Sequence, residues 1–368
     1  MSPRRVLIVG GGLVGLSCAY ELVTRGVTVT LVDPAPALGA TRAAAGMLGA
    51  VSETHFGETD HAPLLLSAAA AWPAFAAAIV AASGIDIAFH ASGTLLCGVT
   101  QSDRVEMDRL AALHLNLGLE TREVNRSELR TIEPSLSARI TRAHLVSSDH
   151  QVDGRATAAA LQAIVRRLGA CFVPQSVISI APQPSGVTVT DNVGHTYEVD
   201  HVVVAAGSKV NSIEGLNRDL VPKVRPVKGE ILRLFDPQRS LRHVIRAMVA
   251  GRSVYLVPRP NGEVVLGATS FENSDDETVR AVAVFELLSD ARSVFPGLDE
   301  LSFMEASAGL RPARDSGNPF IARDGDRITV LGGHNRNGIL LSPITAAVAA
   351  GLILEGAHPQ ADLFEVLT

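Results

Sequence analysis

The 368-residue chain has few cysteines and no excess of positive charge. Its three cysteines, Cys18, Cys97 and Cys171, form no C-x-x-C pair, and neither they nor the 11 histidines show metal-ligand spacing, so the sequence predicts no metal site. An odd, sparse set of cysteines is typical of the reducing cytoplasm, which is the expected location. Because 38 acidic residues exceed 32 basic ones, for a net charge of -6, the sequence indicates no nucleic-acid-binding surface.

The chain also lacks a convincing membrane segment. Leu64 to Ile85 is long and apolar enough to suggest a span. It is mostly alanine, with Pro73 near its middle, and we interpret it as a buried helix of a soluble protein, kinked or divided at Pro73. The apolar run from Arg5 to Ala19 resembles a signal peptide in outline, but a glycine-rich turn breaks its helix. No membrane association is expected.

The first 33 residues carry the clearest pattern. Arg5 to Val9 is a short apolar run rich in branched residues, which predicts a buried strand. Leu13 to Arg25 has apolar residues at helical spacing and is followed by Gly26 as a stop signal. Val27 to Val32 predicts a second strand, and it ends at an acid, Asp33. This order of elements is that of a nucleotide-binding βαβ unit.

Three glycines, Gly10, Gly12 and Gly15, stand between the first strand and the helix in G-x-G-x-x-G spacing. Gly10 allows a tight turn, Gly12 lets the backbone approach a pyrophosphate, and Gly15 lets the helix pack closely on the strand. The helix N-terminus offers free N–H groups to phosphates. Asp33, 18 positions after Gly15, suits ribose hydroxyls and disfavours a 2′-phosphate. The residues alone therefore predict FAD or NAD.

The rest of the chain alternates between two kinds of pattern. His201 to Gly207 is a second buried strand of the type found in parallel sheets, whereas residues 223–275 alternate apolar and polar positions, which favours an antiparallel sheet. The predicted fold class is mixed α/β (α+β), with a Rossmann-like nucleotide-binding domain interleaved with a smaller antiparallel-sheet domain. We place the first domain at residues 1–85, 143–215 and 308–368, and the second at 86–142 and 216–307.

Two further segments could approach a cofactor. Gly39 to Gly49 contains mostly small residues and no charge except that of Arg42. This composition fits either a backbone that packs against a flat group such as a cofactor ring or a tight surface loop. Near the C-terminus, a polar glycine-rich loop, Gly332 to Gly338, follows a predicted strand. Ser342 as N-cap and Pro343 as first helical residue predict that a helix begins there.

The N-terminal fingerprint is followed in order by five further motifs: Ala43-Ala-Ala-Gly-Met-Leu-Gly49, Pro226-Val-Lys-Gly-Glu230, Tyr255-Leu-Val-Pro-Arg259, Gly309-Leu-Arg-Pro312 and Gly333-His-Asn-Arg-Asn-Gly-Ile-Leu-Leu341. Together they resemble the FAD-dependent amine and D-amino-acid oxidase superfamily, and within it the glycine oxidases of the thiamine-thiazole pathway most closely. The resemblance covers residues 4 to about 355. It implies an FAD-binding domain built from three stretches of chain and an interleaved substrate domain.

The resemblance implies that FAD is bound without a covalent link, since no cysteine or histidine matches an attachment motif. The residues expected to contact it are Gly10, Gly12, Leu13, Val14, Gly15, Asp33, Pro34, Thr41, Arg42, Ala45, Gly46, Met47, Val177, His334, Asn335, Arg336, Asn337, Gly338, Ile339 and Leu340. Aimed at the flavin, the helix N-terminus at Ser342 would stabilise negative charge on the reduced ring.

Three residues match the family's active site: Tyr255, Arg311 and Arg336. Arg311 matches the clamp for the substrate's α-carboxylate, which a guanidinium can bind through two parallel hydrogen bonds. The alternatives are a core tyrosine at a strand start for Tyr255, a strand-end arginine for Arg311, and a solvent-facing charge for Arg336.

The implied reaction is hydride transfer from the Cα of a small amino acid to the flavin, giving an oxo acid, ammonia or an amine, and hydrogen peroxide with dioxygen as acceptor. Glycine, sarcosine and D-amino acids are the expected substrates, and a homo-oligomer, a tetramer, is the expected assembly. A different amine substrate, a dehydrogenase with another acceptor, and a non-catalytic FAD-binding subunit are the alternatives. The retained Tyr255, Arg311 and Arg336 argue against the last of these.

Overall fold

The computed structural model describes residues 5–272 and 274–368. Its main parallel layer is a seven-stranded sheet, in which β18 and β20 pair in parallel with each other and run antiparallel to the other five strands. The strand order is β20 (Glu365–Leu367), β18 (Phe320–Asp324), β19 (Ile328–Gly332), β12 (His201–Val204), β1 (Arg5–Val9), β2 (Thr28–Val32), β8 (Cys171–Val173). The predicted strands 5–9 and 201–204 are therefore adjacent and parallel, as their apolar sequences indicated.

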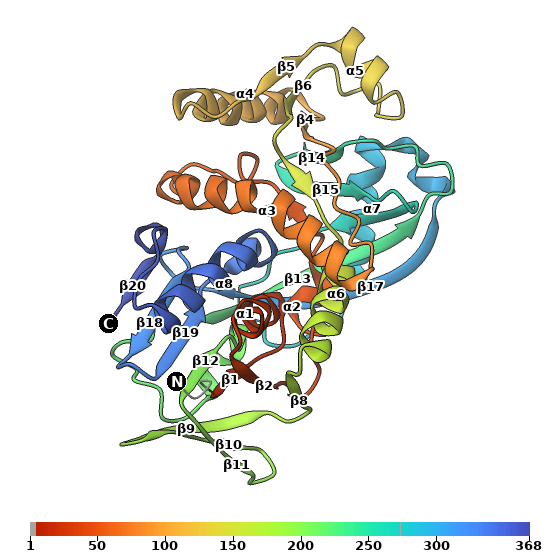
Figure 1. Cartoon of the computed structure of the whole chain (residues 1–368). Helices are drawn as coiled ribbons and strands as arrows, with labels where there is room; N and C mark the ends of the chain where they lie inside the picture. Colours follow the sequence, from red (N-terminus) through yellow and green to blue (C-terminus); the bar gives the residue numbers. More distant parts are fainter. Residues whose placement is uncertain (1–4, 273) are drawn as a thin grey trace.

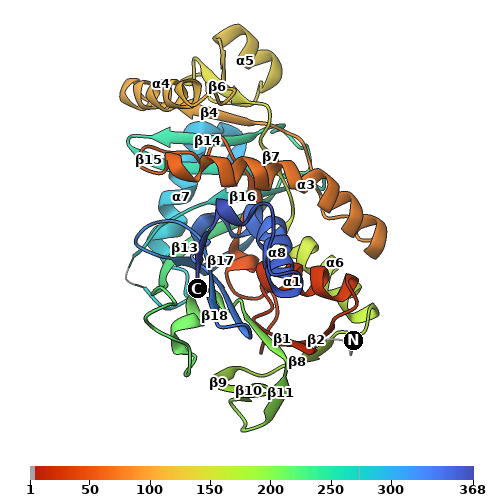
Figure 2. The same cartoon turned by 60° about the vertical axis from the view of Figure 1, so that its left-hand side comes forward.

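The two faces of this sheet are covered by different layers (Figures 1 and 2). Val6, Ile8 and Leu31 pack under helices α1 (Leu13–Thr24), α6 (Gly154–Arg167) and α8 (Gly338–Leu354). Leu7 and Val9, one position along the strand, face the other way onto a small antiparallel sheet. That sheet contains β9 (Val177–Gln183), β10 (Gly186–Asp191) and β11 (Thr196–Val199), and the last two form an antiparallel hairpin.

An eight-stranded, mainly antiparallel sheet forms the second large layer. Its order is β17 (Ser302–Ala313), β13 (Arg225–Phe235), β16 (Glu263–Gly267), β15 (Arg252–Pro258), β14 (Val244–Val249), β4 (Thr94–Gly98), β6 (Ala143–Val146), β5 (Arg122–Val124). Helix α7 (Ala281–Val294) packs on it, and α4 (Gln101–Asn116) and α5 (Arg126–Ile132) lie at its far end, at the top of Figure 1. The sequence's alternating pattern over 223–275 correctly predicted this antiparallel sheet.

Shorter elements connect these layers. Helix α2 (Ala40–Ala43) leads into β3 (Met47–Leu48), which pairs with β7 (His150–Gln151). The 3-10 helices are η1 (Thr59–His61), η2 (Gly207–Ser212), η3 (Pro296–Glu300), η4 (Asn335–Asn337) and η5 (Ala361–Leu363).

Two helical segments, Thr59–Ser83 and Asn335–Leu354, are long and apolar enough to cross a membrane by length and composition. The second is mostly buried in the fold, and α3 (Ala62–Ser83) packs along α8 and α6. Of the two alternatives, kinked or divided at Pro73, division is wrong, because one helix runs through this residue. Trp72, fully buried beside Pro73, anchors this helix by donating from Nε1 to the Leu340 carbonyl at 2.8 Å.

The prediction that the last long helix begins at Ser342 and Pro343 is also wrong, because α8 begins at Gly338 and Pro343 lies inside it. Proline lacks the N–H that would bond the carbonyl of Ile339, four residues earlier. The hydroxyl of Ser342 donates to that carbonyl instead, at 2.9 Å. This serine therefore compensates the proline within the helix, and the N-terminal end that could face a cofactor lies at Gly338.

The division of the chain into two domains stays a prediction, but two of its boundaries do not coincide with sheet boundaries. The expected return to the first domain at residue 143 falls at the start of β6, and the one at 308 falls inside β17. Both strands belong to the eight-stranded sheet. Strand pairing thus moves these boundaries towards the C-terminus, because short polar loops, which mark a boundary in sequence, also occur within one sheet.

Candidate active site

The glycine turn after β1 is shaped by contacts that exclude larger residues. Gly10 has a φ of +103°, and a Cβ on Gly15 would lie 2.0 Å from the Gly10 carbonyl oxygen, so both are required by the protein's own packing. At Gly12, in contrast, a Cβ would meet only the Thr41 hydroxyl, at 3.6 Å. The space beside Gly12 is therefore left open in front of the helix.

The N-terminus of α1 presents backbone donors to this space. Gly12 is the N-cap and has no side chain to cap the helix, and the Leu13 N–H donates to the Thr41 hydroxyl at 3.2 Å. Within residues 5–272 and 274–368, no acceptor is found for the N–H groups of Gly12 and Val14. Free N–H groups and a positive helix end form an anion site, so the turn fits the pyrophosphate of a dinucleotide.

Asp33 lies at the end of β2, next to this turn. Its two carboxylate oxygens accept from the Gly11 N–H at 2.6 Å and the Ala35 N–H at 2.7 Å. Pro34 beside it is exposed, whereas Val177, at the start of β9, is buried in the same cluster as Val32. The expected contacts Asp33, Pro34 and Val177 therefore gather near one end of the parallel sheet.

Residues 40–47, which we call the 40–47 loop, contain the expected contacts Thr41, Arg42, Ala45, Gly46 and Met47. The loop lies against the eight-stranded sheet: a Cβ on Gly309 of β17 would be 2.7 Å from the Ala43 Cβ. Ala45 and Met47 pack with Ile231 of β13. The loop thus lies between the glycine turn, through Thr41, and the antiparallel sheet.

The sheet face below this loop carries Tyr255 and Arg311. Because directly paired residues share a face, the pairings Tyr255–Gly267, Gly267–Ile231 and Val227–Arg311 put both side chains on it. Each lies over a glycine of the neighbouring strand: a Cβ on Gly267 would be 2.4 Å from the Tyr255 hydroxyl, and one on Gly229 would be 2.3 Å from Nη2 of Arg311. The glycines make room for two long side chains to lie flat.

The electrostatics of this pair favour recognition of an anion. Burial raises the pKa of Tyr255 to about 12, with Arg311 opposing the shift, so the phenol is neutral at physiological pH. The Arg311 guanidinium donates from Nη1 to the Thr269 carbonyl at 3.2 Å, and this is its one hydrogen bond to the described part of the chain. Its remaining N–H groups are available to a ligand.

Arg336, the third expected residue, is held by two carboxylates. Its Nε donates to Glu53 at 2.6 Å, and its terminal nitrogens bond Glu58 and the Glu53 carbonyl. Burial opposes the charge of Glu53, but Arg246 and Arg336 outweigh it and lower the pKa of this carboxyl to about 2. Arg246 is paired with Tyr255 across β14 and β15, so the chain Arg336–Glu53–Arg246 connects the final loop to the tyrosine.

Sequence reasoning missed Glu53 and Arg246. Neither belongs to a motif with characteristic spacing, and their contact joins positions 193 residues apart. Only the strand register, which places Arg246 opposite Tyr255, could have indicated that Arg246 belongs to the site.

The final loop, His334 to Leu340, spans η4 and the first turn of α8. His334 is buried, its Nε2 lies 3.1 Å from the Thr345 hydroxyl, and burial lowers its pKa to about 4. Asn335 has a φ of +46°, which asparagine tolerates. The carbonyl of Leu340 is held by Trp72. Asn337, Gly338 and Ile339 lie between these fixed points, and a Cβ on Gly154 of α6 would be 2.8 Å from Ile339. The loop is thus placed beside α1 and α6.

Comparison with known proteins agrees with this geometry. Residues 5–352 match the family described as FAD dependent oxidoreductase. The glycine oxidases of Bacillus licheniformis and Geobacillus kaustophilus are 34% and 31% identical to this chain, each over 95% of this chain and 92% of the relative. The bifunctional protein ThiO/ThiG of Trichormus variabilis is 28% identical, over 96% of this chain and 53% of that protein.

The fold is shared as well. The crystal structure of glycine oxidase from Geobacillus kaustophilus superposes with a TM-score of 0.89 at 30% identity, covering 98% of both chains. The match to the family spans nearly all of the described residues, and two relatives exceed 30% identity over almost their full length. This chain therefore belongs to the FAD-dependent oxidoreductase family and is an FAD-dependent amino-acid oxidase.

Proposed function

We propose that this oxidase acts on a small amino acid with a free α-carboxylate, glycine first and sarcosine or a D-amino acid next, with dioxygen as the acceptor. The observation that carries the proposal is the shared sheet face, where Arg311 and Tyr255 lie flat over Gly229 and Gly267 beneath the 40–47 loop. The two relatives named glycine oxidase support glycine as the substrate.

In this proposal Arg311 binds the substrate carboxylate through two parallel hydrogen bonds. The Thr269 carbonyl holds one guanidinium nitrogen and so sets the direction of the fork. Tyr255, neutral because its pKa is raised to about 12, donates a hydrogen bond to the same carboxylate and does not act as a base.

Arg336 has a narrower role than the resemblance implied. Because its donors are taken by Glu53 and Glu58, we propose that it holds the final loop against residues 53–58 and does not bind the carboxylate itself. Glu53 keeps Arg246 beside Tyr255 in the same way.

The cofactor contacts proposed from the sequence fit the open space at Gly12, the free N–H groups of α1 and the 40–47 loop. When bound, FAD supplies a hydride acceptor and passes two electrons to dioxygen. The substrate loses a hydride from Cα and a proton from nitrogen, and water hydrolyses the imine to an oxo acid and ammonia. Dioxygen takes up two electrons and two protons to give hydrogen peroxide.

The relatives also support a biological setting. A relative of Rhizobium etli named putative thiamine biosynthesis oxidoreductase ThiO, together with the resemblance to glycine oxidases of the thiamine-thiazole pathway, supports a role in thiamine biosynthesis. The few, unpaired cysteines support a cytoplasmic location, and the resemblance to glycine oxidases supports a tetramer.

The experiment is anaerobic mixing of the flavin-loaded protein with glycine, sarcosine and D-alanine, followed by admission of air. Bleaching of the flavin absorption by glycine, with peroxide formed on aeration, is the expected result. Bleaching that persists in air would identify a dehydrogenase with another acceptor. If none of the three amines bleaches the flavin, the small-amino-acid proposal is wrong.

A further inference from the structure

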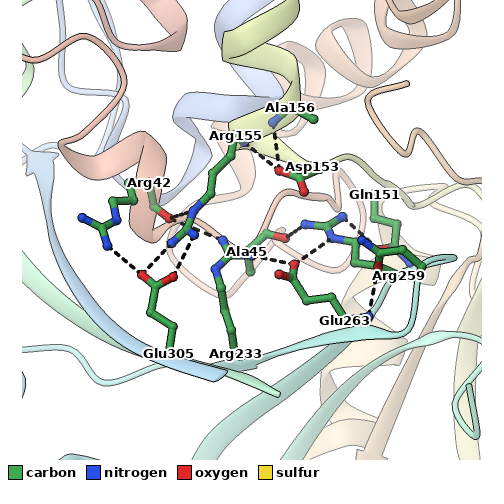
Figure 3. Close-up of polar contacts among 11 residues, drawn as sticks. Arg42, Ala45, Gln151, Asp153, Arg155, Ala156, Arg233, Arg259, Glu263 and Glu305 are labelled. Atoms are coloured by element: carbon green, nitrogen blue, oxygen red, sulfur yellow. Dashed lines mark hydrogen bonds and ion pairs between the residues drawn. The ribbon is translucent and has the colours of Figure 1, made fainter. Parts of the chain in front are cut away.

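The side of the 40–47 loop that faces the antiparallel sheet is held by arginines (Figure 3). The Ala45 carbonyl accepts from Nη2 of Arg259 at 2.5 Å. The Arg42 carbonyl accepts from Nε of Arg155 at 3.0 Å and from Nη2 of Arg233 at 3.4 Å. Two carbonyls of one short loop thus take hydrogen bonds from three guanidinium groups, none of which belongs to the loop.

These arginines are themselves fixed in place. Arg259 and Arg233 are each 3% exposed. Arg259 also donates to the buried Gln151 side chain at 3.0 Å, and Arg233 pairs with Glu263 at 2.5 Å. Burial lowers the pKa of Arg259 to about 10, which leaves it charged at neutral pH. A buried charge with fixed partners cannot move away from the carbonyl it holds without losing hydrogen bonds.

The contact at Ala45 determines the orientation of the next peptide group. In a trans peptide the C=O and N–H point in opposite directions, so a carbonyl aimed at Arg259 turns the Gly46 N–H away from it. Across the two described stretches, no acceptor is found for that N–H. Gly46 itself has a φ of +76°, and a Cβ there would be 2.9 Å from Nη2 of Arg259. The loop therefore presents a free backbone donor on the side opposite the arginine.

We propose that Arg259, assisted by Arg233, is a positioning residue that holds the 40–47 loop in the shape that binds FAD, by way of the Ala45 and Arg42 carbonyls. The proposal rests on the placement of FAD against this loop. It couples the antiparallel sheet, which carries Arg311 and Tyr255, to the cofactor, because Arg259 follows β15, the strand of Tyr255.

The test is FAD titration of apoprotein variants, followed by flavin fluorescence and by the visible absorption spectrum of the complex. We expect Arg259→Met to raise the Kd for FAD by about 10- to 100-fold, since the hydrogen bond from the charged guanidinium to the Ala45 carbonyl is lost. The visible absorption spectrum of the bound flavin should also change. Arg233→Met should have a smaller effect because its bond to the loop is longer. Arg259→Lys should be intermediate, because lysine lacks the fork that reaches Ala45 and Gln151 together.

The matched control is Arg130→Met. Arg130 also donates to backbone carbonyls, those of Leu136, Ser137 and Ile140, but these lie outside the 40–47 loop. Its loss should leave the FAD Kd unchanged even if it lowers the protein's resistance to urea. The proposal is overturned if Arg259→Met binds FAD with wild-type Kd and spectrum, or if Arg130→Met weakens FAD binding equally.

Two outcomes keep this proposal separate from the proposed function. If Arg259→Met does not fold, Arg259→Lys decides: a wild-type Kd and spectrum would overturn the proposal, and a raised Kd would support it. If glycine fails to bleach the wild-type flavin while the arginine variants still weaken FAD binding, the substrate assignment fails and the positioning role stands.

Discussion

The glycine turn and the Tyr255–Arg311 sheet face are built in opposite ways. The turn comes from residues 5–33, a continuous stretch, and it acts through backbone N–H groups and the absence of side chains at Gly10, Gly12 and Gly15. The sheet face combines β13, β15, β16 and β17 with the 40–47 loop, and it acts through long side chains, the neutral Tyr255 and charged arginines. A site made of backbone can be local, whereas a site made of charged side chains must bring together partners that compensate one another.

The charges show the same contrast. At the turn, the carboxylate of Asp33 accepts hydrogen bonds from two backbone N–H groups, those of Ala35, two residues away, and Gly11, 22 residues away. At the sheet, Arg155 and Arg42 share Glu305, and Arg233 uses Glu263, across separations of 30 to 263 residues. The turn can therefore be disrupted by adding a methyl group, and the sheet face by removing a charge.

The largest expected effect is at the turn, where two glycines serve different purposes. Gly15→Ala should destabilise the apoprotein by about 4 kcal/mol or more, because the new Cβ would overlap the Gly10 carbonyl oxygen. Gly12→Ala should change apoprotein stability by less than about 1 kcal/mol, since its Cβ meets only Thr41. It should nevertheless weaken FAD binding at least about tenfold by filling the phosphate space. Urea denaturation and FAD titration measure the two quantities.

Gly12→Ala and Gly15→Ala serve as each other's control, because they add the same methyl group at positions three residues apart on the same helix end. Equal loss of apoprotein stability in Gly12→Ala and Gly15→Ala would contradict the division of roles.

This contrast explains which parts the sequence predicts. The βαβ unit, its glycines and Asp33 are read directly, because they lie within one continuous stretch of 33 residues. The 40–47 loop and the strand of Tyr255 are found as motifs, but the contacts that hold them are not. The hydrogen bond from Arg259 to the Ala45 carbonyl and the ion pair of Arg246 with Glu53 join residues about 200 positions apart. The helix start at Ser342 fails for a different reason: a serine before a proline is a typical N-cap pattern, and only the structure reveals that the hydroxyl replaces a missing N–H inside the helix.

The next effect in size concerns the sheet face. Arg311→Met should lower kcat/KM for glycine roughly 150-fold, because the substrate carboxylate loses its charged partner. This factor corresponds to about 3 kcal/mol of lost transition-state stabilisation. The FAD Kd should stay at the wild-type value, since Arg311 does not contact the 40–47 loop carbonyls. Arg314→Met is a suitable control: this arginine is three residues away and pairs with Glu365 on β20. Loss of FAD binding in Arg311→Met would show that the substrate and cofactor sites are not separable here.

The smallest effect is on the pH dependence of the unfolding free energy, to which His334 and Glu53 contribute in different pH ranges. Burial lowers the pKa of His334 to about 4, below its ordinary 6.5. Unfolded chains therefore take up a proton that the folded chain does not, and stability falls as pH drops from 6.5 towards 4. Glu53, with a folded pKa of about 2 against 4.5, contributes stability that is lost only as pH falls from 4.5 towards 2.

His334→Gln tests the first window. Between pH 7 and pH 5, the wild-type apoprotein should lose roughly 2 kcal/mol of unfolding free energy through His334 alone, at about 1.4 kcal/mol per pH unit below 6.5. The variant keeps a partner for Thr345 but cannot be protonated, so its loss over the same interval should be smaller by that amount. Urea denaturation at the two pH values measures the difference. Because burial is the cause of the lowered pKa of His334, this loss comes from desolvation of the imidazolium. An equal pH dependence in both proteins would mean that His334 is hydrated in solution and that burial does not lower its pKa.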